Sequence, residues 1–282
     1  MRFGINTFLF ASPFTNESTK LFEDYRAWGF DSVEIPIEDR SHIDPAFVKS
    51  ELAKHGLVCG SLCGAFGPDR DLRGTPEQQK ASTDYILYLI DAAVALDCPT
   101  VAGPLYSAVG RAGFVPDKER KVQWKLVVKN LKKISKYALK KGVTLAVEPL
   151  NRFETDFINT CDQVLQLVAD VDSPALKVHL DTFHMNIEEK DSVAAIRKAG
   201  KQLAHFHACG CDRGTPGSDH INWPGIAAAL KKIGYQGDAV IESFTPDVKV
   251  IAKAAAIWRN IEPSQKEIAV KGLKFLQKTF AA

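Results

Sequence analysis

The chain has 282 residues, 45% of them hydrophobic and 25% charged, so it is long enough to bury a substantial core. Its 36 basic and 34 acidic residues leave a formal charge of +2, which argues against nucleic-acid or membrane partners and favours a small neutral ligand. No apolar run suits a membrane span, the N-terminus lacks a signal-peptide core, and six cysteines are too few for a disulfide framework. We expect a cytoplasmic protein with reduced thiols.

Short apolar runs alternate with stretches of helical periodicity along the whole chain. The runs lie at 3–8, 32–37, 57–63, 98–102, 143–148, 176–181, 203–207 and 238–243. The helical stretches lie at 18–28, 45–55, 76–96, 121–141, 160–170, 190–199, 223–233 and 247–258. This alternation predicts parallel strands with right-handed crossovers, closed into an α/β fold of the (β/α)8 TIM barrel type. A doubly wound open sheet is the alternative.

The helix ends agree with these boundaries. Ser18 precedes the first stretch and Gly29 follows it, and residues of these types satisfy the unpaired N–H and C=O groups of helix termini. A ninth stretch, 264–280, predicts an extra C-terminal helix that packs against the barrel exterior or a partner subunit. We expect one barrel domain over residues 1–282, assembled as a homodimer or homotetramer.

Four consecutive predicted strands end on a residue that can bind a metal. These residues are Glu148, Asp181, His207 and Glu242. Functional side chains of barrel enzymes lie at the carboxyl ends of the strands. The residue before each of the four is apolar and should face the helices, so strand alternation points all four into the barrel. The sequence therefore predicts that they converge on a divalent cation.

Three carboxylates and one imidazole form an oxygen-rich, negatively charged ligand set. Such a set suits Mn2+, Mg2+ or Co2+ better than structural zinc, and we expect Mn2+. Cys209 and Cys211 follow His207 closely and offer a soft-metal alternative, but they lack the usual C-x2-C spacing. Glu34, inside the second run, should also point inward, either as a partner of the site or as an ordinary satisfied polar group.

Four segments resemble the ketose 3-epimerases, the group that includes D-tagatose, D-allulose (psicose) and L-ribulose 3-epimerases within the xylose-isomerase-like barrel superfamily. They are VEPLNRFETDFINT (147–160), HLDTFHMNIEE (179–189), HACGCDRGTPGSDHINW (207–223) and VIESF (240–244). The resemblance implies that the four strand-end residues bind the metal and that Glu148 and Glu242 are also the catalytic acid/base pair. It further implies that Glu154, His184 and Arg213 contact the O1–O3 end of the substrate.

Other positions bear on the substrate. Asn6 occupies a first-strand position where relatives often carry an aromatic residue near the sugar, and CGC replaces a more polar stretch before Asp212. An apolar wall beside O4–O6 is predicted from Phe8, Phe66, Leu105, Tyr106 and Phe244. We therefore expect Asn6 and Phe244 to take part in substrate binding.

The chemistry follows from the residues. Inverting the carbon next to a ketose carbonyl requires removal of its proton and return to the opposite face, through a cis-enediolate. A divalent cation that chelates O2 and O3 stabilises the developing charge, and two carboxylates can exchange the proton. The sequence thus predicts an isomerase that epimerises C3 of free ketoses such as D-tagatose, D-fructose/D-allulose and L-ribulose.

Several alternatives remain open from the sequence. A hydroxypyruvate isomerase or an inosose dehydratase has a similar barrel and similar metal ligands. A two-metal aldose–ketose isomerase needs more inward acids and a catalytic Lys, and a DNA-repair endonuclease needs more His and a basic groove. A sugar-binding barrel without catalysis does not need an acid on both faces of the sugar.

Overall fold

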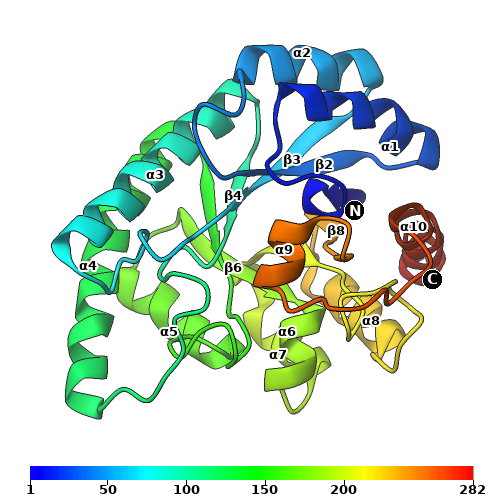
Figure 1. The fold of residues 1–282 in the computed structure, drawn as a ribbon. Helices are drawn as coiled ribbons and strands as arrows, with labels where there is room; N and C mark the ends of the chain where they lie inside the picture. Colours follow the sequence, from blue (N-terminus) through cyan, green and yellow to red (C-terminus); the bar gives the residue numbers. More distant parts are fainter. Residues whose placement is uncertain (282) are drawn as a thin grey trace.

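Eight parallel strands close into a barrel at the centre of the computed structural model, which describes residues 1–281 (Figure 1). The strands are β1 Arg2–Asn6, β2 Ser32–Ile37, β3 Val58–Gly64, β4 Thr100–Gly103, β5 Thr144–Val147, β6 Leu176–Asp181, β7 Leu203–His207 and β8 Asp238–Ile241. Each strand pairs in parallel with its neighbours, and β8 closes the barrel against β1. The predicted barrel is confirmed, and the open sheet is wrong.

Helices surround this barrel (Figure 1). They are α1 Phe22–Trp28, α2 Pro45–His55, α3 Pro76–Ala95, α4 Asp117–Lys141, α5 Cys161–Val171, α6 Thr182–Glu188, α7 Ser192–Ala199, α8 Trp223–Ile233, α9 Lys249–Ala254 and α10 Gln265–Ala281. Short 3-10 turns occur at Thr7–Leu9, Asn16–Leu21 and Gly200–Gln202. Among the described helices, none combines the length and hydrophobicity that crossing a bilayer requires.

Strand alternation separates the core from the barrel interior, as β2 shows. Val33 and Ile35 are fully buried in the apolar core. Glu34 lies between them and is also fully buried, but its Oε1 is 2.7 Å from Nε2 of His207 on β7. Glu34 therefore points into the barrel, as predicted, while its neighbours pack against the helices.

The structure corrects several predicted helix boundaries. The stretch predicted as one helix from 18 is a 3-10 turn followed by α1, and Thr15 rather than Ser18 precedes it. The helix α4 begins at Asp117, four residues earlier than predicted, because Pro116 stands immediately before its acidic first turn. The helix α6 was not predicted. It starts directly after β6, where the side chain of Asp181 accepts from the backbone N–H of Phe183 at 2.8 Å.

The last two helices, α9 and α10, pack at different places on the barrel. The predicted helix 247–258 is only the short α9, and it borders the cavity at the carboxyl end of the barrel instead of covering the outside. The helix α10 covers the outside near β1 and β8, where Phe280 stacks on Phe3 with ring centroids 6.2 Å apart. The extra C-terminal helix is thus confirmed, packed on its own barrel (Figure 1).

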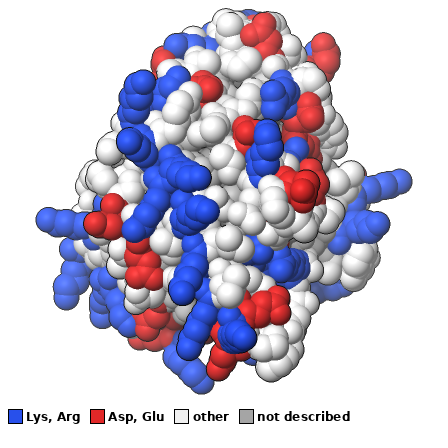
Figure 2. All heavy atoms as spheres, turned by 90° about the vertical axis from the view of Figure 1, so that its left-hand side faces the viewer, with Lys and Arg blue, Asp and Glu red and all other residues white. Residues whose placement is uncertain are grey.

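Basic side chains gather on the flank that carries α3 and α4. Figure 2 shows this face, with acidic residues standing among the Lys and Arg. The exposed lysines of α4 are Lys118, Lys121, Lys125, Lys129, Lys132, Lys133, Lys136, Lys140 and Lys141. The opposite side of α4 buries Val127, Leu131 and Ile134 in the core. These lysines therefore form the solvated face of an amphipathic helix.

Candidate metal centre

The four predicted strand-end residues meet at the carboxyl end of the barrel. One ligand atom from each of Glu148, Asp181, His207 and Glu242 lies within 4.8 Å of the others, and all four residues are buried. Nδ1 of His207 is 3.2 Å from Oε2 of Glu242, 4.0 Å from Oδ2 of Asp181 and 4.0 Å from Oε1 of Glu148. The convergence predicted from strand parity is therefore present.

Parallel register explains why the side chains meet. Asp181 and His207 end their strands and are paired directly across β6 and β7. Glu148 and Glu242 each follow the last residue of a strand, on β5 and β8. Because these strands are adjacent in sequence and in space, four consecutive strand ends bring the ligand atoms to one height around the barrel axis.

A polar layer supports the centre from the barrel interior. The carboxylate of Glu34 lies 2.7 Å from Nε2 of His207 and 2.6 Å from Nε2 of His205, and it accepts from Oγ of Ser61 at 2.5 Å and from Nδ2 of Asn6 at 2.7 Å. Asn6 Nδ2 also lies 3.1 Å from Oε1 of Glu242. The amide of Asn6 thus faces two carboxylates, and Asn6 does not line the cavity described below.

Arg213 reaches into the middle of the carboxylates. Its Nη1 donates to Oδ2 of Asp181 at 2.6 Å and to Oε2 of Glu242 at 2.9 Å, and its guanidinium stacks near the rings of Phe183 and Phe244. The backbone of Arg213 has φ +67°, a left-handed conformation that costs energy for a residue with a Cβ. A positive charge therefore already stands beside two of the four candidate ligands.

Two more predicted substrate contacts lie beside Arg213. His184 is buried on α6, where Nδ1 accepts from the backbone N–H of Asn151 at 3.0 Å and Nε2 lies 3.0 Å from Nη2 of Arg213. Oε1 of Glu154 accepts from Nδ2 of Asn151 at 2.7 Å. Asn151 was not predicted, although it stands between Glu148 and Glu154 in a segment that the sequence already singled out.

Burial and neighbouring charges separate the two glutamates. Burial raises the pKa of Glu148 well above its ordinary value, and the negative charges of Glu242 and Asp181 add to this effect. Burial also acts on Glu242, but the positive charges of His207 and Arg213 outweigh it and lower its pKa. Burial disfavours the charged form of His207, yet Glu34 and Glu242 raise its pKa well above the usual value. Without metal, the surroundings thus shift the pKa values of the two glutamates in opposite directions.

The centre opens into a cavity of about 480 Å³. Its lining includes Glu148, Glu154, His184, Arg213 and Glu242 at the metal centre, and Phe8, Phe66 and Phe244 from the predicted apolar wall. Leu105 and Tyr106 are buried but do not line the cavity. The hydroxyl of Tyr106 instead donates to the backbone oxygen of Glu148 at 3.0 Å. Four residues in and after α9 also line the cavity, and the sequence did not predict this role: Val250, Ile251, Ala254 and Ala255.

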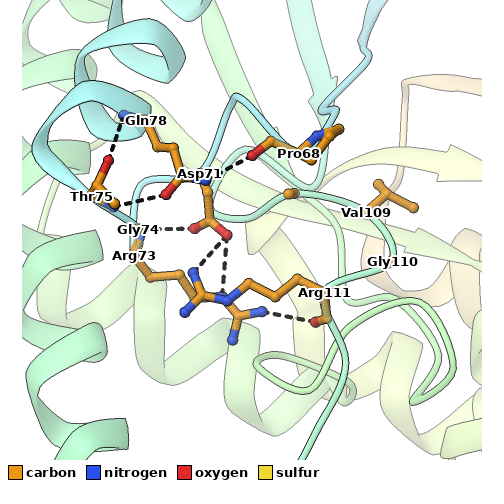
Figure 3. A pocket seen from close by; sticks show the side chains of 10 residues that line it. Pro68, Asp71, Arg73, Gly74, Thr75, Gln78, Val109, Gly110 and Arg111 are labelled. Carbon is orange, nitrogen blue, oxygen red and sulfur yellow. Dashed lines mark hydrogen bonds and ion pairs between the residues drawn. The ribbon is translucent and has the colours of Figure 1, made fainter.

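A surface hollow of about 670 Å³ lies next to this cavity, and Figure 3 shows the residues that line the hollow. Pro68, Val109 and Gly110 line both spaces. On the hollow side, Nη2 of Arg73 donates to the backbone oxygen of Arg111 at 2.9 Å, and Arg73 also bonds Asp156 beyond the hollow. The side chain of Arg73 is fully buried. Its contacts connect its own loop to the loops that carry Arg111 and Asp156.

The cysteines after His207 do not form a metal site. Cys209 is buried, and its thiol donates to the backbone oxygen of Glu242 at 2.8 Å. Cys211 is partly exposed, with its sulfur 3.6 Å from Nδ1 of His220. Within residues 1–281, neither cysteine belongs to a group of candidate ligands. Cys63, the residue before the last of β3, does belong to one such group, with Glu34 and Glu242, and its place near the strand end could have singled it out.

The residues fit a divalent cation. Oε1 of Glu148 is buried without a hydrogen-bond partner, which costs free energy unless another group satisfies it. The donor set of three carboxylates and one imidazole is the kind that hard and borderline divalent cations take. The second nitrogen of His207 contacts Glu34, as the free nitrogen of a metal-binding His commonly contacts a carboxylate.

Comparisons with known proteins agree with this geometry. The xylose isomerase-like TIM barrel family model matches residues 22–279. A Synechocystis sp. protein named "Probable ketose 3-epimerase" is 37% identical over 291 residues, covering 99% of this chain and 97% of that protein.

Solved structures of 3-epimerases also resemble this chain. An L-ribulose 3-epimerase superposes with a TM-score of 0.92 and 30% identity, covering 99% of this chain and 94% of its own. A D-allulose 3-epimerase from Methylomonas sp. in complex with D-allulose gives a TM-score of 0.92 and 26% identity, covering 99% and 97%. The chain therefore belongs to the xylose isomerase-like TIM barrel family and, within it, to the ketose 3-epimerases, which are isomerases.

Proposed function

We propose that this enzyme catalyses the metal-dependent epimerisation of C3 of free ketoses, such as D-tagatose, D-fructose/D-allulose and L-ribulose. The observation that carries the proposal is the convergence of Glu148, Asp181, His207 and Glu242 within 4.8 Å at the base of a cavity. The names of the relatives support it, because they include epimerases that act on L-ribulose and D-allulose.

The four residues would hold the cation, and we propose Mn2+ with Mg2+ or Co2+ as substitutes. A bound cation would stabilise the negative charge that develops on O2 and O3 of the sugar when C3 loses its proton. Glu34 supports the orientation of His207, since its carboxylate lies 2.7 Å from Nε2 and leaves Nδ1 facing the centre.

Glu148 and Glu242 would move the proton at C3. They belong to β5 and β8, three strands apart around the barrel, so they can approach the sugar from different sides. With the cation bound, two carboxylates on different sides of C3 can serve as one acid and one base. In one direction Glu242 removes the C3 proton and Glu148 delivers a proton to the opposite face; the reverse reaction exchanges the roles.

Polar residues above the centre would orient the sugar. The planar guanidinium of Arg213 can donate several hydrogen bonds to adjacent hydroxyl groups. The N–H of Asn151 donates to Nδ1 of His184, which places the proton of the neutral ring on Nε2. Nε2 lies 3.0 Å from Nη2 of Arg213, so two donors face each other, and we propose that a sugar oxygen accepts from both. We propose that Glu154 accepts from a hydroxyl at the same end and that Phe244 packs against the carbon chain.

A metal-supplemented substrate screen tests the function. The protein is treated with EDTA and then assayed with and without Mn2+ on D-tagatose, D-fructose, D-allulose, L-ribulose and hydroxypyruvate, with products separated by chromatography. We expect C3 epimers from the ketoses with Mn2+ only. Isomerisation of hydroxypyruvate without any epimer, or full activity without metal, contradicts the proposal.

We also propose a cytoplasmic homodimer or homotetramer. Phe114, Phe153 and Trp258 follow strands β4, β5 and β8 and are 95%, 74% and 73% exposed, and large exposed apolar side chains often mark contact surfaces. Light scattering after size exclusion should give an oligomer, and Phe153→Ser with Trp258→Ser should weaken it. A wild-type monomer at micromolar concentration contradicts this proposal.

A further inference from the structure

The cavity carries one charged side chain that the metal centre does not use. Among its described lining residues, the other ionisable groups with charged forms at neutral pH are Glu148, Glu154, His184, Arg213 and Glu242, which belong to the metal centre. Glu38 stands apart, immediately after the end of β2. Along this strand it lies four residues beyond Glu34, or about 13 Å at roughly 3.3 Å per residue. It therefore lies toward the outer end of the cavity.

The carboxylate of Glu38 is held in place but retains acceptor capacity. Oγ of Ser12 donates to Oε1 at 2.5 Å. Oε2 is buried without a hydrogen-bond partner, which costs free energy unless a bound group satisfies it, and its neighbour Nδ1 of His42 is 3.9 Å away. A carboxylate offers about four acceptor positions, so a single hydroxyl donor leaves most of them free.

No cation neutralises this carboxylate at hydrogen-bond distance. The nearby guanidinium of Arg70 donates instead to the backbone oxygens of Glu38 and Ala65, both at 2.9 Å, and stacks on the ring of Tyr85. Within residues 1–281, no Lys lines the cavity, and its one Arg, Arg213, is paired with Asp181 and Glu242. The carboxylate of Glu38 thus has no hydrogen-bonded cation, and the cavity wall around it is mainly apolar.

We propose that Glu38 is a specificity-determining residue that accepts a hydrogen bond from the terminal hydroxyl of an unphosphorylated ketose and disfavours ketose phosphates. A sugar whose O2 and O3 lie at the metal centre extends its other end along the cavity toward Glu38. A hydroxyl there satisfies the carboxylate, whereas a phosphate meets a like charge with no paired cation. This inference rests on the proposed C3 epimerisation.

Three matched ketoses test the inference on the Mn2+-loaded enzyme. They are D-fructose, 6-deoxy-D-fructose and D-fructose 6-phosphate, compared by kcat/KM for C3 epimerisation. For the wild type we expect D-fructose to exceed each of the others by about 10- to 100-fold, the usual effect of one hydrogen bond to a charged group. Glu38→Ala should lower kcat/KM for D-fructose by a similar factor while changing that for 6-deoxy-D-fructose less than about threefold.

Two control variants separate the effect of the charge of Glu38 from that of its position. Ser12→Ala removes the donor to Glu38 but keeps the carboxylate, so discrimination should persist. Glu38→Gln removes the charge at nearly constant shape, so relative activity on the phosphate should rise. The Mn2+ dissociation constant, measured by calorimetry, should stay within about twofold in all variants, because Glu38 does not contact the four candidate ligands.

The outcomes separate the two proposals. Equal losses on D-fructose and its 6-deoxy analogue in Glu38→Ala, or a wild type that prefers the phosphate, contradict the role of Glu38 alone. A wild type that epimerises none of these ketoses, while another reaction proceeds, contradicts the proposed function and the inference with it.

Discussion

Protons and a cation compete for the same atoms at the metal centre. Without metal, the pKa of His207 and that of Glu148 are both raised well above their ordinary values. Both groups must lose their protons to bind a cation, so Mn2+ affinity should rise with pH between 6 and 8, by up to about tenfold per unit for each proton displaced. Calorimetry at pH 6, 7 and 8, in buffers of different ionisation enthalpy, measures the affinity and the protons released.

The metal-free protein should show the opposite trend in stability. A raised folded-state pKa contributes stability that is complete below the unfolded-state value and is lost as pH rises through the folded-state value. His207 and Glu148 therefore both make the metal-free protein less stable at higher pH. A Mn2+ affinity that is flat from pH 6 to 8 would falsify this assignment of the protons.

Glu34 should control metal affinity without touching the metal. Its carboxylate contacts Nε2 of His207 and thereby sets the ring orientation. Glu34→Gln should weaken Mn2+ binding by about 10- to 100-fold, the usual effect of losing such a partner. Calorimetric titration measures it, and circular dichroism shows whether the fold persists. An unchanged dissociation constant in a folded variant would show that Glu34 is an ordinary satisfied polar group.

The sequence could predict the inward residues but not their partners. Strand parity alone brings Glu148, Asp181, His207 and Glu242 together, because a barrel repeats one rule at every strand. The position of Arg213 among the carboxylates depends on a left-handed turn after β7, and that of Asn6 depends on a hydrogen bond to β2. Such contacts between distant segments leave no local pattern in a single sequence.

Loops at the active end are held by one buried arginine. Arg73 contacts Ser107, the backbone of Arg111, and Asp156 on neighbouring loops. Asp156 keeps Arg120 at 3.3 Å, so Arg73→Met chiefly removes the hydrogen bonds of the buried guanidinium to Ser107 and to the backbone of Arg111. It should reduce the free energy of unfolding by about 2–3 kcal/mol. Urea denaturation measures the change.

Arg111→Met is the matched control for this element. Arg111 pairs with Asp71, but its side chain is 36% exposed, so solvent screens the interaction and the expected loss is about 1 kcal/mol or less. If Arg73→Met costs no more than Arg111→Met, the buried arginine does not hold the loops together. Comparing kcat/KM of the two variants shows whether the cavity wall formed by Pro68, Val109 and Gly110 depends on Arg73.

Helix existence was predictable, while helix placement was less so. Periodicity located α2, α3 and α8 correctly because their caps and apolar faces are local features. It missed α6, whose N-cap is Asp181, a residue already assigned to the metal centre. It also predicted a helix over 247–258 where α9 spans only Lys249–Ala254. An apolar helical face does not say whether a core or a cavity lies beneath it.

At the scale of the whole molecule, eight repeats of one unit determine the architecture. The eight parallel strands close into a barrel through the pairing of β8 with β1, and this arrangement places the carboxyl end of every strand at the same face. The reaction centre is therefore specified by the fold, whereas the sugar-selecting end depends on loops and on α9. This difference explains why the sequence specified the chemistry more closely than the substrate.

Transfer of the C3 proton by two glutamates is the central claim. The Mn2+-loaded enzyme is incubated with D-fructose in deuterium oxide, and the product is analysed by NMR and mass spectrometry. We predict a C3 epimer with one deuterium at C3, and a loss of about 10²- to 10⁴-fold in its rate of formation in Glu148→Gln and in Glu242→Gln. A C3 epimer that carries no deuterium, or normal rates in both variants, contradicts the account.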